Sequence, residues 1–161
     1  MTFDTRAFRN ALGCFPTGVA VVTAQSDGPH PKGITVNSFT SVSLDPPLVL
    51  WCVDGRSDRC DTFVKAHGFT ISILDAVHKG LSAKLARRGE HSLDGIALLP
   101  TELGAPALAE ALAVFECGRE SVHPGGDHVI LLGRVLRFAF RKAGAPLVFY
   151  RGHYVALAKG I

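Results

Sequence analysis

Short apolar runs separated by turn sequences dominate the first part of the chain. Residues 19–24, 33–39 and 48–53 are rich in β-branched and aromatic side chains, and turn sequences containing Gly or Pro lie between them at 27–29 and 45–47. Such runs are typical of β-strands, because β-branched and aromatic side chains fit a pleated surface. The pattern therefore predicts three strands in this part of the chain.

Apolar residues at helical spacing mark three further segments. They are residues 4–15, residues 57–68, and the stretch in which Val77, Leu81 and Leu85 follow one another in steps of four. Residues three or four positions apart lie on one face of a helix. We therefore expect three helices, the first of them amphipathic.

The rest of the chain has the apolar runs and turn residues of an antiparallel β protein. We expect a surface loop at 98–109 and strands at 69–74, 111–117, 129–140, 147–150 and 154–158. No alternation of strand, helix and strand of the type that builds a parallel sheet occurs. The expected fold is mainly β, a small β-barrel with peripheral helices, and residues 1–161 are expected to form one domain.

Composition and charge argue against several kinds of partner. The chain has 17 Lys and Arg residues against 14 Asp and Glu, spread along its length, so nucleic acid is not expected. No apolar run approaches the roughly 20 residues of a membrane span. The first residues lack the pattern of a secretory signal, and a cytoplasmic location is expected. The four cysteines form no Cys-x-x-Cys pair and are expected to be free thiols.

Motifs of several large enzyme classes are absent from the sequence. It has no Gly-x-Gly-x-x-Gly after a strand, no Walker loop, no Gly-x-Ser-x-Gly and no His-Glu-x-x-His. The histidines are scattered without a recognisable ligand spacing, so no metal site is expected.

Polar side chains interrupt one of the apolar strands. Thr35, Asn37 and Ser38 place hydroxyl and amide groups within and at the end of the predicted strand 33–39. These groups could hydrogen-bond a flat, polar heterocycle. They could equally be the solvent-facing residues of a half-exposed strand, and spacing alone does not decide between the two.

A second polar cluster opens the predicted helix 57–68. It consists of Ser57, Asp58, Arg59 and Thr62. Free N–H groups at a helix start, together with hydroxyls and a guanidinium, can hold a phosphate. The alternative is an ordinary helix cap.

Two further clusters lie in the last third of the chain. His123 and His128 flank glycines that would permit close approach of a ligand. Tyr150, Arg151 and Tyr154 combine aromatic rings with a cation, which suits stacking on a nicotinamide or pairing with its phosphates. As a bare pattern, the second cluster could equally be a hairpin turn.

These clusters occur in an order that resembles the flavin reductase-like family, the short FMN-binding split barrels that serve two-component monooxygenases. The resemblance covers nearly the whole chain. It is carried by the residues at 15–19 (FPTGV), 33–48 (GITVNSFTSVSLDPPL), 81–82 (LS), 126–128 (GDH) and 150–154 (YRGHY).

The resemblance implies a fold, an activity and a set of site residues. The fold would be a six-stranded Greek-key split barrel, usually a homodimer, with flavin beside the barrel. The activity would be hydride transfer from NADH or NADPH to FMN, or FAD, with reduced flavin passed to a separate monooxygenase. His128 would approach the nicotinamide. The implied cofactor contacts are Thr35, Val36, Asn37, Ser38, Ser41, Cys52, Val53, Ser57, Thr62, Ala86, Arg87, Tyr150, Arg151 and Tyr154.

One position departs from the family pattern. Leu85 stands where the family usually has phenylalanine, which removes a ring near the cofactor but keeps an apolar contact. Two alternatives to a reductase remain open from sequence. One is a split barrel that retains its flavin for an oxidation or electron transfer of its own, and the other is a flavin-binding module without reductase activity.

Overall fold

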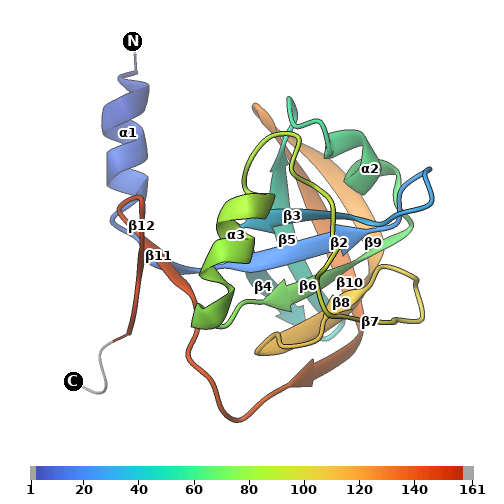
Figure 1. Ribbon diagram of the computed structural model, residues 1–161. Helices are drawn as coiled ribbons and strands as arrows, with labels where there is room; N and C mark the ends of the chain where they lie inside the picture. Colours follow the sequence, from blue (N-terminus) through green and yellow to red (C-terminus); the bar gives the residue numbers. More distant parts are fainter. Residues whose placement is uncertain (1–2, 158–161) are drawn as a thin grey trace.

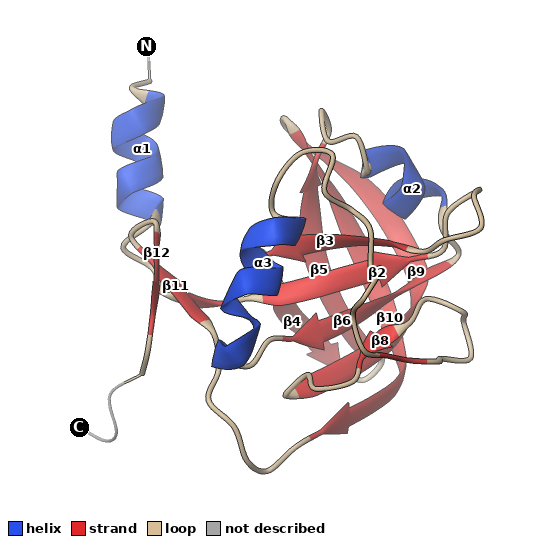
Figure 2. Ribbon diagram, viewed as in Figure 1, coloured by secondary structure: helices blue, strands red, loops and turns tan. Residues whose placement is uncertain are grey.

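A seven-stranded antiparallel sheet forms the centre of the computed structural model, which describes residues 3–157 (Figures 1 and 2). The strand order is β3-β2-β6-β9-β10-β5-β4. The strands are β2 (Ala20–Ala24), β3 (Lys32–Val36), β4 (Thr40–Leu44), β5 (Pro47–Asp54), β6 (Gly68–Ile73), β9 (Ala113–Gly125) and β10 (His128–Phe140). The expectation of a mainly β fold with few helices is confirmed.

The sheet curls around an apolar core, with the helices outside it (Figure 2). Trp51 of β5 is fully buried, and its ring meets those of Phe63 and Phe69 edge to face at 5.0 and 5.6 Å between ring centroids. Gly133 of β10 lies so close to this cluster that an added Cβ would stand 2.7 Å from the Phe69 ring. A glycine at this position therefore allows β10 to pass over the aromatic core.

The hydrogen bonding does not confirm the expected six-stranded split barrel. There are seven strands in the sheet, and its edge strands β3 and β4 are not paired with each other. The reason lies in the segment 33–39, which the sequence predicted as one strand. The chain leaves β3 after Val36, bends at Asn37, and begins the unpredicted strand β4 at Thr40.

The Ser38 side chain bridges part of the gap left by this bend. Its hydroxyl accepts a hydrogen bond from the Cys52 N–H at 2.9 Å and donates one to the Cys52 carbonyl at 3.2 Å. The pairing of β4 with β5 ends at Thr40 and Leu50, before β5 reaches Cys52. Ser38 thus connects the segment after β3 to a part of β5 that β4 does not pair with.

Two small sheets complete the β structure. β1 (Thr17–Gly18), β11 (Val148–Tyr150) and β12 (His153–Val155) form one, and β7 (Leu98–Leu99) and β8 (Ala107–Leu108) form the other. The predicted surface loop 98–109 therefore contains a short strand pair. The predicted strand 154–158 is shorter, and Ala158 lies outside the described residues.

All three predicted helical regions are helical, and the first two are shorter than expected. They are α1 (Thr5–Leu12), α2 (Cys60–Lys65) and, preceded by the 3₁₀ turn η1 (Ala76–His78), α3 (Lys79–Leu85). The Asp4 carboxylate caps α1 by accepting hydrogen bonds from the N–H groups of Arg6 and Ala7. Helix α1 buries none of its residues and stands apart from the main sheet, beside the β11–β12 hairpin (Figure 1).

Candidate functional site

Three adjoining cavities form a groove along β3, next to the end of β5 and the end of α3. Thr35 of β3 lines all three. We name them the polar cavity, of 390 Å³, the histidine cavity, of 220 Å³, and the aromatic cavity, of 210 Å³. Small-molecule sites are typically concave and about 300–1,000 Å³ in volume. The sequence-predicted residues that line the groove are Thr35, Val36, Asn37, Ser38, Cys52, Val53, Ser57, Ala86, His128 and Tyr154.

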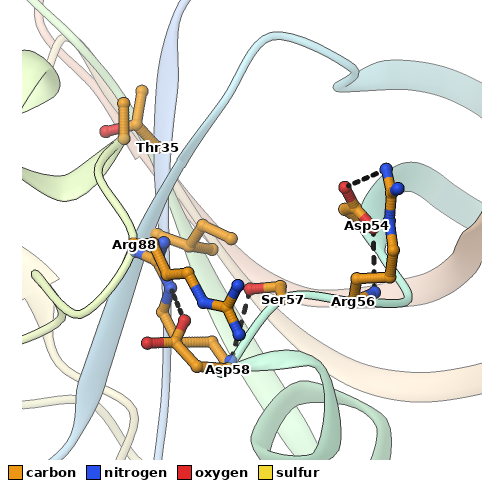
Figure 3. Close-up of a pocket in the computed structure, with 9 residues that line it drawn as sticks. Thr35, Asp54, Arg56, Ser57, Asp58 and Arg88 are labelled. Atoms are coloured by element: carbon orange, nitrogen blue, oxygen red, sulfur yellow. Dashed lines mark hydrogen bonds and ion pairs between the residues drawn. The ribbon is translucent and has the colours of Figure 1, made fainter.

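Charged side chains from two loops wall the polar cavity (Figure 3). The loop after β5 contributes Arg56, whose side chain is 79% exposed and whose Nε lies 3.3 Å from Asp54 Oδ1. The hydrogen bond from the Arg56 backbone N–H is the main cause that lowers the pKa of Asp54. The segment after α3 contributes Arg88. Figure 3 shows Arg56 and Arg88 on either side of Ser57, so two accessible guanidinium groups flank a hydroxyl.

Neither Arg56 nor Arg88 was among the predicted site residues. The sequence reasoning selected Arg59 for the phosphate cluster and Arg87 for the segment after α3. The structure buries Arg59, which is 4% exposed, and the Arg87 side chain does not line the groove. The sequence did offer a signal for both residues: Arg56 directly precedes Ser57, and Arg88 is the second arginine of the pair that follows Ala86.

The Arg59 guanidinium is bound to the protein itself. Its Nη1 donates to the Leu85 carbonyl at 2.7 Å, and its Nη2 donates to the Arg87 carbonyl at 3.0 Å. Longer bonds from Nη1 reach the carbonyls of Gly33 and Glu90. The sequence left open whether this guanidinium holds a phosphate, and in the structure both of its terminal nitrogens bond to backbone carbonyls of β3, α3 and the loop after α3.

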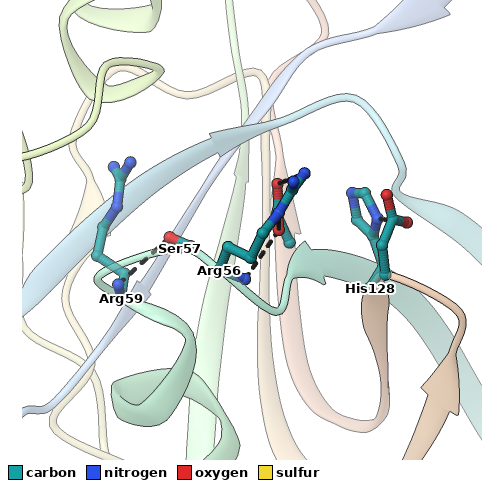
Figure 4. Close-up of polar contacts among 6 residues, drawn as sticks. Arg56, Ser57, Arg59 and His128 are labelled. Carbon is teal, nitrogen blue, oxygen red and sulfur yellow. Dashed lines mark hydrogen bonds and ion pairs between the residues drawn. The ribbon is translucent and has the colours of Figure 1, made fainter.

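The histidine cavity lies at the start of β10. His128 lines it, and the ring Nδ1 lies 2.7 Å from Asp127 Oδ1 (Figure 4). The hydrogen bond from His128 is the main cause that lowers the pKa of Asp127. Gly126, with φ of +73°, forms the turn that leads from β9 into β10. The second predicted imidazole, His123, lies back along β9 and bonds Ser121 instead of lining the groove.

The aromatic cavity is formed where the β11–β12 hairpin meets β3. Phe149 and Tyr154 of this hairpin line it, with ring centroids 5.4 Å apart. The Tyr154 hydroxyl lies 2.8 Å from the Ser82 hydroxyl of α3, and Thr35 Oγ1 donates to the Ser82 carbonyl at 2.9 Å. Ser82 thus joins β3, α3 and β12 around this end of the groove.

Two of the polar side chains predicted to bond a heterocycle are already engaged with the protein. Thr35 gives its hydroxyl hydrogen to Ser82, and Ser38 gives its hydrogen to Cys52. Asn37 differs, because it is exposed and its amide has no hydrogen-bond partner within residues 3–157. Asn37 lines both the histidine and the aromatic cavities, so its amide is the most available of the three.

Five predicted cofactor contacts lie outside the groove. One of them, Thr62, lines a separate hollow together with Lys65 and Gly68. The other four line none of the three cavities of the groove: Ser41, which is exposed on β4, Arg87, Tyr150 and Arg151.

The segment 150–154 is a hairpin turn, one of the two readings that the sequence left open. Arg151 has φ of 47° and Gly152 has φ of 82°, and two consecutive positive φ values are typical of a tight β-hairpin turn. Of the predicted residues in this segment, only Tyr154 reaches the groove, while the Arg151 guanidinium lies over the Tyr150 ring at 5.3 Å.

The four cysteines are free thiols, as predicted. Cys14 is exposed, Cys52 lines the histidine cavity, and Cys60 and Cys117 are buried. Burial raises the pKa of Cys117 to about 12. Within the described residues, no three His, Cys, Asp or Glu side chains are grouped so that they could hold a metal ion. None of the helices in residues 3–157 is long and apolar enough to cross a membrane.

Comparison with known proteins identifies the family. The model of the flavin reductase like domain matches residues 12–158. The FMN reductase (NADH) SmoA of Agrobacterium fabrum is 47% identical over 94% of this chain and 85% of its own. The flavin-dependent monooxygenase reductase subunit HsaB of Rhodococcus jostii is 37% identical over 96% of this chain and 78% of its own.

A solved structure agrees with these matches. The NADH:FAD oxidoreductase SgcE6 of Streptomyces globisporus, in complex with NAD and FAD fragments, superposes with a TM-score of 0.90. It is 36% identical, and the match covers 96% of this chain and 93% of that one. The resemblance found in the sequence is confirmed, and the chain belongs to the flavin reductase-like family.

Proposed function

We propose that this protein is an NAD(P)H-dependent flavin reductase that supplies reduced flavin to a separate flavin-dependent monooxygenase. The observation that carries the proposal is the groove itself. A cavity lined by arginines, aspartates and a serine, an apolar strand with the exposed Asn37 amide, and a histidine all adjoin Thr35. These parts suit an elongated ligand whose anionic end lies in the polar cavity and whose flat polar ring lies along β3.

The donor set of the polar cavity fits the phosphate end of FMN. Guanidinium groups bind phosphate through paired N–H donors, and Arg56 and Arg88 both line this cavity. The Ser57 hydroxyl, which accepts from the Arg59 N–H at 3.3 Å, keeps its own hydrogen to donate to a phosphate oxygen. FAD fits the same donors through its pyrophosphate.

The ring of the flavin would lie along β3. Val36 supplies apolar contact there, and the Asn37 amide offers both a donor and an acceptor to the polar edge of the ring. Cys52 and Val53 of β5 form the floor of the histidine cavity beside it. Tyr154, fixed by its bond to Ser82, closes the aromatic end of the groove.

The protein's part in the reaction is binding and orientation. When bound, flavin supplies the redox chemistry as the acceptor of a hydride from the nicotinamide. Asp127 holds His128 Nδ1 and thereby fixes the orientation of the imidazole, which would align the nicotinamide at the mouth of the histidine cavity. Hydride transfer needs no acid and base pair from the protein, so binding and alignment of the two rings are the tasks left to the groove.

Names of the relatives bear on the choice of cofactors. SmoA is described as an NADH-dependent FMN reductase and SgcE6 as an NADH:FAD oxidoreductase. HsaB is described as the reductase subunit of a flavin-dependent monooxygenase. These descriptions support NADH as the donor, FMN or FAD as the acceptor, and a monooxygenase as the partner. We further propose that residues 1–161 act as one domain, with a cytoplasmic location.

We also propose that the protein acts as a homodimer. Support comes from apolar side chains that the single chain leaves uncovered. Phe8 of α1 is 50% exposed and Phe15, just after α1, is 76% exposed. Leu44 of β4 and Phe138 of β10 are 95% and 68% exposed on the sheet. A second copy of the chain could cover large apolar side chains such as these, and light scattering after size-exclusion chromatography tests for it.

The direct test of the function is oxidation of NADH or NADPH by the purified protein in air with FMN, FAD or riboflavin. We expect rapid loss of NADH absorbance that depends on added flavin. The His128→Ala variant should turn over more slowly while its flavin dissociation constant stays that of the wild type, because His128 would orient the nicotinamide. A protein that binds flavin but does not oxidise either nicotinamide would contradict the reductase assignment.

A further inference from the structure

The contacts of Arg59 are unusual for an arginine in the wall of a charged cavity. Its side chain lines the polar cavity yet is 4% exposed. Four backbone carbonyls, from Gly33, Leu85, Arg87 and Glu90, accept hydrogen bonds from its two terminal nitrogens. Three of these four carbonyls belong to a single stretch of six residues at the end of α3 and beyond it. In Figure 4 the guanidinium points away from Arg56 and His128.

This six-residue stretch is part of the groove. Ala86 lines the polar and the aromatic cavities, and Arg88 lines the polar cavity. The residues from Ala86 to Glu90 are all exposed to solvent, and Gly89 adopts a positive φ of 81°. An exposed loop with few contacts of its own is usually mobile, because ordering it costs conformational entropy. The N–H groups of Ala86, Arg87 and Glu90 bond to Ser82, Lys84 and Arg87 nearby in the chain, whereas the two terminal nitrogens of Arg59 connect the stretch to residues distant in sequence.

Asp58 supports the same arrangement. Its Oδ2 accepts from the Gly89 N–H at 2.9 Å, while its Oδ1 lies 3.3 Å from Arg59 Nε. Burial opposes ionisation of this carboxyl, but the hydrogen bond from Gly89 and the charge of Arg59 outweigh burial and lower its pKa. Asp58 therefore stays ionised at neutral pH and compensates the buried guanidinium. The two residues together contact the loop through both carbonyl and N–H groups.

We propose that Arg59 is a positioning residue that holds residues 85–90 against β3 and so fixes one wall of the flavin site. It acts through Ala86 and Arg88 and does not bind the ligand, because its terminal N–H groups are directed at carbonyl oxygens. This inference rests on the proposed flavin reductase function for the identity of the ligand. The loop contacts themselves do not depend on that function.

The test compares Arg59→Met with wild type and with a matched control, Arg141→Met. Arg141 is also an arginine that donates to two backbone carbonyls, of Glu110 and Ala111, and pairs with an aspartate, Asp75. It does not line the groove. The control therefore removes a comparable arginine clamp at a distance from the site.

Two measurements report on the wall. The first is limited trypsin digestion without flavin, with mass spectrometry to quantify cleavage after Arg87 and Arg88. The second is the FMN dissociation constant from quenching of flavin fluorescence. We expect Arg59→Met to be cleaved faster at these two bonds and to bind FMN roughly tenfold more weakly, since ordering a loop on binding costs affinity that a pre-ordered loop does not lose. Arg141→Met should change neither.

The steady-state kinetics separate positioning from a general structural role. The KM for flavin should rise with the dissociation constant, while the KM for NADH and the kcat at saturating flavin stay within about twofold, because Arg59 does not contact the reacting atoms. Arg59→Lys keeps the charge but has one ammonium in place of the two terminal guanidinium nitrogens. Its FMN dissociation constant and its KM for flavin should therefore lie between those of wild type and Arg59→Met. If Arg59→Met does not fold, Arg59→Lys takes its place in every measurement.

The outcomes are decisive in both directions. Unchanged cleavage after Arg87 and Arg88, or unchanged FMN affinity in spite of faster cleavage, would overturn the assignment of Arg59 as a positioning residue. Equal loss of FMN affinity in the Arg59 and Arg141 variants would also overturn it. A wild-type protein that neither binds flavin nor oxidises NADH would refute the proposed function, and this outcome is distinct because the protease measurement needs no flavin.

Discussion

Removal of the Ser38 hydroxyl should weaken the connection between the segment after β3 and the strand β5. This single oxygen accepts from the Cys52 N–H at 2.9 Å and donates to the Cys52 carbonyl at 3.2 Å. Pairing of β4 with β5 ends at Leu50, two residues earlier. Ser38→Ala therefore leaves both main-chain groups of Cys52 without the partner that a neighbouring strand would provide.

The size of the effect follows from these two bonds. Leaving a buried polar group unpaired costs about 1–3 kcal/mol, and a typical bond contributes about 0.5–1.5 kcal/mol net. Ser38 and Cys52 are half-buried, so water reaches the site in part and the lower values apply. We expect the free energy of unfolding to fall by about 2 kcal/mol. For a chain of 161 residues this corresponds to a fall in Tm of about 4–8 °C.

The assay is urea unfolding followed by far-UV circular dichroism, with thermal melting as a second measurement. Ser41→Ala is the matched control, because Ser41 is exposed on β4 and its hydroxyl makes no hydrogen bond within residues 3–157. The control should stay within about 0.5 kcal/mol of wild type, as surface substitutions usually do. If Ser38→Ala were as stable as Ser41→Ala, the argument that Ser38 replaces a strand partner would be wrong.

Three further results are expected. Cys14 should react rapidly with a thiol reagent in the folded protein, whereas Cys117, whose pKa burial raises to about 12, should react only after unfolding, as peptide mapping of the labelled protein can show. Arg88→Met should weaken FMN binding roughly tenfold or more but leave riboflavin, which has no phosphate, nearly unaffected in the same fluorescence titration. Tyr154→Phe removes the bond to Ser82 and should lower the free energy of unfolding by about 0.5–1.5 kcal/mol in urea.

Much of the sheet could be predicted because its strands carry local signals. Residues 19–24 and 69–74 became β2 and β6, where β-branched and aromatic side chains fill the core. Strand β4 gave no such signal, since its residues 40–44 are mostly exposed and their pairing with β5 depends on the bend at Asn37 that precedes it. Non-local pairing of that kind is invisible to a pattern read along the chain.

The residues that the strand β3 contributes to the site could be predicted from the sequence, but the arginines that its loops contribute could not. Thr35, Asn37 and His128, which the resemblance implied as site residues, all line the histidine cavity. The resemblance could not tell which arginine faces outward, because Arg59 and Arg56 differ only in tertiary contacts: one is enclosed by backbone carbonyls and the other is exposed. Sequence reasoning treats a guanidinium near a helix start as an anion ligand, and burial decides whether it is free to act as one.

The β11–β12 hairpin links two parts of the molecule that are otherwise separate. At its turn, the Arg151 N–H donates to the Gly13 carbonyl at the end of α1, at 2.9 Å, and at its second strand Tyr154 contacts Ser82 beside the groove. A second copy packed on α1 would therefore restrain the wall that contacts the flavin. By thermodynamic reciprocity, flavin would then tighten the association of the two copies to the same degree that association tightens flavin binding.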